Sequence, residues 1–316
     1  MALSFDTFNT PGGYAWWYLD ALSDDGQCGL TLIAFLGSAF SPYYAWARRK
    51  GQGVADPLNH CALNVALYSR PGSNAPNAWT MTERARRAVQ RSVSTLTIGP
   101  SSVTWRGDVL HVAIDERSVP WAKPVRGEVR LYPTSRPLSQ SYALDAVGRH
   151  QWCPIAPCAR VEVDLDQPSL SWHGRGYLDS NWGERPLADD FARWDWSRAA
   201  LNGRTAVLYD ATRRDGSRLS LAMEFDERGR ASMFSAPELM DLPATPWRLA
   251  RATRSDQVAD TRIEQTLEDG PFYARSLLHT HLLGETAVAM HESLCLDRWS
   301  QPLVQAMLLF RMPRRG

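Results

Sequence analysis

One short stretch of the chain, residues 172–187, surrounds a single carboxylic acid with large aromatic side chains: WHGRGYLDSNWGERPL. Side chains alternate between the two faces of a strand, so Tyr177, Asp179 and Asn181 are predicted to share one face. Burial disfavours a charged carboxylate, and a buried Asp179 would be a neutral, proton-bearing group. Such a group can act as a general acid. The same spacing also fits a structural role, in which Asp179 caps a turn or bonds to Asn181.

A second pair lies upstream in RHQWCP, where His150 and Trp152 share one face by the same alternation. His150 could bond to the acid or to a water molecule, and Trp152 could offer the face of its ring. A histidine beside an aromatic residue is also common in an ordinary core. The remaining candidates for substrate contact are Trp172, Trp182 and Asn181.

Other chemistry finds little support in the sequence. His279 and His281 fall on one strand face with His291 further on, but no third ligand follows from the spacing, so no metal site is expected. The motifs GxSxG, GxxxxGK[ST] and HExxH do not occur. The five cysteines follow neither a CxxC nor a zinc-ribbon spacing, which indicates free thiols in a cytosolic compartment.

The composition narrows the class of protein. A formal net charge of +1 over 316 residues gives no electrostatic footprint for nucleic acid. The N-terminus lacks the pattern of a secretory signal, and the longest apolar run, Leu30–Phe40, is too short for a spanning helix. We expect a soluble protein that at most lies on a membrane surface. Thirteen Trp, ten Tyr and nine Phe indicate either a large aromatic core or a cavity lined with rings.

Short apolar segments separated by turn residues predict a mainly β fold, a sandwich or a barrel. The pattern includes a strand at 307–312, and hairpins at Gly107-Asp108, Asp215-Gly216 and Arg228-Gly229. The best helical candidate is 79–93, although its charges could equally cover a strand or loop. Residues 184–197 interrupt the rhythm with proline and acidic residues, which predicts two domains, 1–186 and 187–316.

Several long stretches together resemble one family. They are PGGYAWWYLDALSDDG, LIAFLGSAFSPYYAWAR, DPLNHCALNVALY and GRGYLDSNWGERPL, followed near the C-terminus by HESLCLDRW and FRMPR. The chain is similar through these stretches to the bacterial carotenoid 1,2-hydratases, also called hydroxyneurosporene synthases. The resemblance implies two lipocalin-like β domains in tandem. It also implies a cofactor-free addition of water to the terminal C1=C2 double bond of an acyclic carotenoid such as neurosporene or lycopene.

The resemblance also implies roles for individual residues. The family's proposed proton donor falls on Asp179, its neighbouring tyrosine on Tyr177, and its His-x-Trp pair on His150 and Trp152. Protonation of the alkene at C2 leaves a tertiary cation at C1, which water captures. Desolvated aromatic faces stabilise such a cation by about 2 kcal/mol each. His150 would either take the proton of the water or orient the acid.

A polyene must be collected from a bilayer, so the resemblance implies a cytoplasmic protein associated peripherally with the inner or photosynthetic membrane. Two aromatic and basic segments, 40–50 and 190–196, are candidate interfacial loops. The second could equally lie in an interface between domains. Two other functions remain open: a lipocalin-like carrier that only holds a polyene, and an isomerase or cyclase that uses the same acid.

Overall fold

The computed structural model describes residues 4–8 and 10–315 and divides into two compact units. The first consists of Met1–Pro186 with Gln305–Gly316, and the second of Leu187–Val304. The division after residue 186 coincides with the predicted boundary, but residues 305–316 do not belong to the second unit. They join the first because β22 (Arg314–Arg315) pairs in parallel with β4 (Ala78–Arg84).

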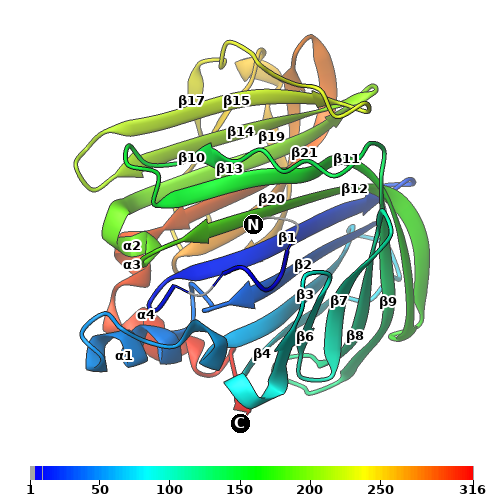
Figure 1. Cartoon of the computed structure of the whole chain (residues 1–316). Helices are drawn as coiled ribbons and strands as arrows, with labels where there is room; N and C mark the ends of the chain where they lie inside the picture. The colour runs from blue at the N-terminus through cyan, green and yellow to red at the C-terminus, as the bar shows by residue number, and fades with distance from the viewer. Residues whose placement is uncertain (1–3, 9, 316) are drawn as a thin grey trace. The chain divides into compact units, whose positions relative to one another are not determined.

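The first unit is built on one curled 13-stranded sheet (Figure 1). Its strands lie in the order β22-β4-β3-β2-β1-β12-β11-β9-β8-β7-β6-β5, and β10 pairs with β11. The remaining strand bounds are β1 (Tyr14–Ser23), β2 (Cys28–Leu36), β3 (Cys61–Ser69), β5 (Val89–Arg91), β6 (Thr95–Ile98), β7 (Ser101–Arg106), β8 (Val109–Arg117), β9 (Pro124–Pro133), β10 (Tyr142–Ala143), β11 (His150–Gln167) and β12 (Leu170–Gly183). Helix α1 (Pro42–Lys50) and the 3-10 helices η1 (Pro57–Asn59) and η2 (Arg86–Ala88) connect strands.

The two faces of this sheet differ in what they bury. One face packs into a continuous apolar cluster to which Leu19, Leu32, Val65 and Leu178 belong. Strand β8 alternates buried with more exposed residues, as a strand with one covered face should. In β1, by contrast, nine of the ten residues are buried, so both of its faces are covered. The second face of β1 and β12 carries the polar and aromatic residues of the candidate site.

The second unit contains a seven-stranded sheet, in the order β16-β15-β14-β13-β21-β20-β19, and a two-stranded sheet of β17 and β18. Its strands are β13 (Phe191–Leu201), β14 (Arg204–Arg213), β15 (Arg218–Asp226), β16 (Ala231–Met233), β17 (Leu239–Leu242), β18 (Arg251–Arg254), β19 (Arg262–Asp269), β20 (Tyr273–Leu282) and β21 (Glu285–Cys295). Its helices are α2 (Leu187–Asp190), η3 (Val258–Asp260) and α3 (Leu296–Trp299), and α4 (Pro302–Leu308) follows at its end. Ala199, Leu208 and Leu278 lie in its apolar core. The expectation of a mainly β protein is confirmed.

Two local predictions need correction. Residues 79–93 form β4, η2 and β5 rather than a helix, because β4 pairs along its length with β3. Residues 307–312, predicted as a strand, instead end helix α4 and form a turn. The buried apolar residues of this stretch and of the helix before it are Val304, Leu308 and Met312, and their spacing of four is helical rather than strand-like. In the described part of the chain, every helix is too short or too polar to cross a membrane.

Candidate active site

Three neighbouring strands, β1, β12 and β11, bring the predicted catalytic residues onto one surface. Between β1 and β12, Tyr18 lies opposite Asp179. Between β12 and β11, Asn181 lies opposite Trp152. Directly opposite residues in an antiparallel pair point to the same side of the sheet. We call this surface the Asp179 face. Its residues are Tyr14, Trp16, Tyr18 and Asp20 of β1, Thr31, Ile33 and Phe35 of β2, His150 and Trp152 of β11, and Tyr177, Asp179 and Asn181 of β12.

The Asp179 carboxyl group is buried, with 2% of the residue exposed. Trp152 Nε1 donates a hydrogen bond of 2.8 Å to Asp179 Oδ2. Tyr177 OH donates one of 2.7 Å to the same oxygen. Both donors are themselves fully buried. The structure therefore brings together three of the four predicted catalytic residues in direct contact.

This arrangement distinguishes the two carboxyl oxygens chemically. An indole N–H is a donor and never an acceptor, so Oδ2 must be an acceptor in this contact. When the acid is neutral, its proton is then expected on Oδ1. When the proton leaves, the two bonds at Oδ2 stabilise the carboxylate that remains. The geometry suits a group that gives a proton away in a dry environment.

His150, the fourth predicted residue, lies further along the same face. It is opposite Gly183, four residues from Asp179 on β12, a separation of about 13 Å along a strand. His150 Nδ1 lies 2.8 Å from Tyr14 OH, and both residues are fully buried. A Cβ atom at Gly183 would lie 2.5 Å from His150 Nδ1 and from Tyr14 Cε1, so glycine leaves room for the pair.

Aromatic rings line the Asp179 face around Trp16 and Trp152. The rings of Tyr14 and Trp16 are stacked, with centroids 5.0 Å apart. Trp16 also packs near Phe35, at 6.1 Å, and the Trp152 ring lies 5.5 Å from that of Tyr142. The negative faces of such rings favour a nearby cation.

The three residues predicted to contact the substrate lie on different faces of the sheet. Asn181 lies on the Asp179 face, between Trp16 and Trp152 in the strand register. Trp182 points to the other face and packs against the apolar cluster of the first unit. Trp172 is half-buried and packs against the same cluster. The alternation of β12 separates these two indole rings from the acid.

Cys153 belongs to the apolar cluster on the other face of the sheet, and His279, His281 and His291 lie in the second unit. Burial raises the pKa of the Cys153 thiol to about 12, so it stays protonated. The rings of His279 and His281 have centroids 6.2 Å apart. His291 instead bonds to two serine hydroxyl groups, and burial lowers its pKa to about 3. Within residues 4–8 and 10–315, no group of three or more His, Cys, Asp or Glu side chains is placed to hold a metal ion.

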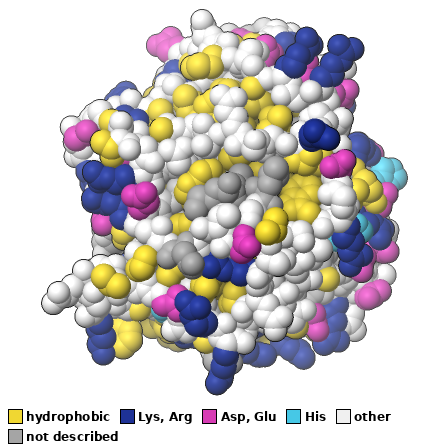
Figure 2. Space-filling view, in the orientation of Figure 1, with side chains coloured by type: hydrophobic (Ala, Val, Ile, Leu, Met, Phe, Trp, Pro, Cys, Tyr) yellow, Lys and Arg dark blue, Asp and Glu magenta, His cyan; other side chains and the backbone are white. Residues whose placement is uncertain are grey.

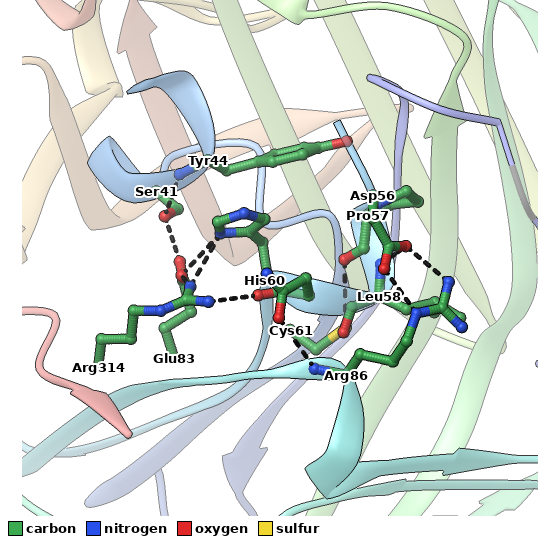
Figure 3. Close-up of polar contacts among 11 residues, drawn as sticks. Ser41, Tyr44, Asp56, Pro57, Leu58, His60, Cys61, Glu83, Arg86 and Arg314 are labelled. Atoms are coloured by element: carbon green, nitrogen blue, oxygen red, sulfur yellow. Dashed lines mark hydrogen bonds and ion pairs between the residues drawn. The ribbon is translucent and has the colours of Figure 1, made fainter. Parts of the chain in front are cut away.

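A second buried polar cluster joins Ser41, His60, Glu83 and Arg314 (Figure 3). Its residue types suggest a Ser–His–acid triad, but the connections differ. Ser41 Oγ donates to Glu83 Oε2, whereas a nucleophilic serine would bond to the imidazole. His60 Nδ1 lies 2.8 Å from Glu83 Oε1, and Arg314 also bonds to that carboxylate. The cluster ties the C-terminal strand to β4 and is structural.

Tyr14, Trp16 and Tyr18 were not among the predicted site residues, although the sequence contains a signal for them. The segment YAWWYLD has a period of two, which sends these three residues and Asp20 to one side of a strand. Which side meets Asp179 depends on the pairing of β1 with β12, more than a hundred residues away in the chain.

Comparison with known proteins finds long matches to one family. The family model described as carotenoid hydratase CrtC matches residues 32–316. The chain is 54% identical over 313 residues to the acyclic carotenoid 1,2-hydratase of Thiocapsa roseopersicina, covering 99% of this chain and 76% of that protein. It is 49% identical over 314 residues to the protein of the same name from Rubrivivax gelatinosus, with the same coverage of 99% and 76%.

A solved structure shares the fold at much greater distance. The crystal structure of kievitone hydratase from Nectria haematococca has a TM-score of 0.52 and 10% sequence identity, and the match covers 92% of this chain and 90% of that one. At this identity the likeness concerns the fold, and it agrees with the expected lipocalin-like β architecture. The long matches at high identity are what decide the family. This chain belongs to the carotenoid hydratase CrtC family.

Proposed function

We propose that this protein is a carotenoid 1,2-hydratase, a hydro-lyase that adds water across the terminal C1=C2 double bond of an acyclic carotenoid such as neurosporene or lycopene. The observation that carries the proposal is the buried Asp179 carboxyl, with two donors on one oxygen, beside a wall of aromatic rings. Family membership supports the same reaction. The reaction as written needs no cofactor, because an acid and water supply every atom.

In the proposed mechanism, Asp179 transfers the proton on Oδ1 to C2 of the alkene. The π electrons form the new C2–H bond and leave a tertiary cation at C1. Trp152 and Tyr177 hold the resulting carboxylate through their bonds to Oδ2. Trp16 and the Trp152 ring stabilise the cation, at about 2 kcal/mol for each desolvated ring. Water then adds at C1, which produces the tertiary alcohol.

We assign a supporting role to His150. His150 contacts the hydroxyl group of Tyr14, and the Tyr14 ring is stacked on Trp16. These two contacts hold the Trp16 ring in place on the Asp179 face. Both the aromatic rings and the acid are needed, because without the rings the barrier to protonation of the alkene would be higher by several kcal/mol.

The decisive experiment is Asp179→Asn. We expect hydration to fall by about a hundredfold to ten-thousandfold, since the amide cannot donate a proton of comparable acidity. Binding of lycopene and the thermal melt should stay close to wild type. The assay is incubation with lycopene in detergent, with no cofactor added, followed by mass spectrometry for the gain of one water.

The assay also separates the other two functions. Binding of lycopene by the wild-type protein without a gain of mass would favour a carrier. A new product of unchanged mass would favour an isomerase or cyclase. Near-native turnover by Asp179→Asn would contradict the assignment of the acid.

We further propose that the protein works at the cytoplasmic surface of a membrane and contacts it through helix α1. This segment was expected to be a loop, but Ser41 caps a helix whose last turn is basic. Trp46 is 54% exposed, and Lys50 Nζ lies 4.1 Å from the centre of its ring. Figure 2 shows basic and hydrophobic side chains side by side in the region of α1, at the lower left. Such pairs suit the interface between headgroups and acyl chains.

The other candidate segment, 190–196, offers less to a membrane. Most of it lies in β13, which buries Phe191, Trp194 and Trp196. We therefore expect Trp46→Ser to weaken co-sedimentation with anionic phosphatidylglycerol vesicles several-fold, and Trp247→Ser, an exposed indole of the second unit, to leave it unchanged. Equal binding of both variants and wild type would contradict the role of α1.

A further inference from the structure

A second carboxylic acid lies on the Asp179 face. Asp20 of β1 is fully buried, with 0% of the residue exposed. It lies directly opposite Tyr177 of β12 on one side and opposite Thr31 of β2 on the other. Tyr177 and Thr31 are also fully buried. A carboxyl group is costly to bury, so its presence here calls for a role.

Asp20 and Asp179 are close neighbours across the strand pair. Tyr18 is opposite Asp179, and Asp20 is two residues further along β1 on the same face. Diagonal neighbours of this kind have α-carbons about 7–8 Å apart, with side chains that can approach more closely. Two carboxyl groups that share such a site disfavour double ionisation, so one proton between them is the preferred state. One group can then be an acid while the other is a base.

The Asp179 face is divided into an aromatic and a polar side. On one side of the Tyr18–Asp179 pair lie Trp16, Asn181 and Trp152 in register, and beyond them Tyr14 and His150. On the other side lie Asp20, Tyr177 and Thr31. A polyene chain and its cation are stabilised by rings, whereas water needs hydrogen-bonding partners. Asn181, Tyr14 and His150 are polar too, but Asp20 is the carboxyl group that shares this face with Asp179 and can both bind water and accept its proton.

We propose that Asp20, assisted by Thr31, holds the attacking water and accepts its proton. This inference rests on the proposed hydratase function and adds the group that removes a proton from the attacking water. The water oxygen forms the C1–O bond with a lone pair, one of its O–H bonds breaks, and the proton passes to the Asp20 carboxylate. Alkene and water have then become a tertiary alcohol, with no change of oxidation state overall.

The cycle closes when the proton returns from Asp20 to Asp179. The oxygen of Asp179 that takes up this proton is Oδ1, because Tyr177, which lies opposite Asp20 in the register, donates to Oδ2 throughout. The titratable groups that face Asp20 from its own and the adjoining strands are Tyr18 of β1 and Tyr177 and Asp179 of β12, while β2 contributes Thr31 and Ile33. Asp20 and Asp179 are thus the acids of this set.

The test is Asp20→Asn, assayed in D₂O. With Asp179 intact, deuterium should still be transferred to C2 of the alkene and form the cation at C1. Water should then add to this cation poorly. The cation can instead lose a proton from C2 to the Asp179 carboxylate and re-form the alkene, so recovered lycopene should carry deuterium. Hydration should fall by about a hundredfold or more. In Asp179→Asn neither deuterium uptake nor hydration is expected. Lycopene binding, measured by tryptophan quenching, should match wild type in both variants.

Two further variants keep the test decisive. Asp20→Glu retains a base and should recover part of the turnover. The decrease of kcat at low pH, which Asp20→Asn should lose, should also return in Asp20→Glu. Asp115→Asn makes the same change at a half-exposed position of β8 and should behave as wild type. Wild-type hydration by Asp20→Asn would overturn the proposal. Loss of both hydration and deuterium uptake would overturn it as well, since Asp20 would then act only through Asp179. Wild-type turnover by Asp179→Asn would instead refute the acid of the proposed function.

Discussion

At the scale of single residues, the site depends on how one carboxyl group is held. Asp179 Oδ2 receives both the indole N–H of Trp152 and the phenol of Tyr177. Both bonds strengthen as negative charge develops on the carboxylate during proton transfer. Donors that strengthen in the transition state accelerate the reaction, whereas equal binding of the ground state would not.

Trp152→Phe tests this directly, because it keeps an aromatic ring and removes the donor. A hydrogen bond to a charged group contributes about 1.5–3 kcal/mol, so we expect kcat to fall by about 10- to 100-fold with lycopene binding retained. The matched control is Trp182→Phe, the same substitution on the opposite face of the sheet. We expect it to cost some stability through lost packing and to leave kcat close to wild type. A larger loss of kcat in the control would contradict the assignment of faces.

At the scale of elements, the sheet that carries the Asp179 face also includes β22 (Arg314–Arg315) at one edge. Strand β22 is two residues long and pairs with β4. Its Arg314 bonds to Glu83, a carboxylate with 0% of its side chain exposed (Figure 3). Arg314 also donates to the carbonyl oxygen of Asn59. A buried anion whose cation is removed is strongly destabilising.

We therefore expect Arg314→Ala to lower the free energy of unfolding by about 3 kcal/mol, measured by urea denaturation. The control is Arg315→Ala on the same strand, whose residue is exposed. It should change stability by no more than about 0.5 kcal/mol. Equal effects of the two variants would show that the cluster does not anchor the strand.

At the scale of the whole molecule, each unit carries a buried ionisable group with an opposite response to pH. In the first unit, burial raises the pKa of Glu116 to about 7, from an ordinary value of 4.5. The folded chain then binds more protons than the unfolded chain between pH 4.5 and 7, so stability falls as pH rises. In the second unit, the pKa of His291 is lowered from 6.5 to about 3 by burial. The unfolded chain takes up this proton first, so stability is lost as pH falls below 6.5.

Between pH 4.5 and 6.5 the two contributions oppose each other, each at up to about 1.4 kcal/mol per pH unit. Glu116→Gln should therefore make the slope of unfolding free energy against pH more positive in this window, and His291→Gln should make it more negative. Urea denaturation at several pH values from 5 to 6.5 measures both slopes. His173→Gln, at a side chain that is 73% exposed, is the control for the second variant. Slopes that change in the same direction would contradict this account.

Much of the site could be predicted because its pattern is local. Strand alternation placed Tyr177, Asp179 and Asn181 on one face, and the structure agrees. The same rule placed Trp182 on the opposite face, so its selection as a substrate contact followed residue type rather than pattern. The error at 307–312 had a similar origin, since a short apolar run is compatible with either a strand or a helix.

The sequence by itself determined the strand-rich fold, the faces of each strand, and the presence of an acid among aromatic residues, because a period of two acts between near neighbours. The tertiary structure decided which strands meet. It placed Tyr18 and Asp20 beside Asp179, directed two donors to one oxygen, and returned residues 305–316 to the first unit. Those pairings join segments far apart in the chain, and their register is set by the burial of both faces together, which local pattern does not encode.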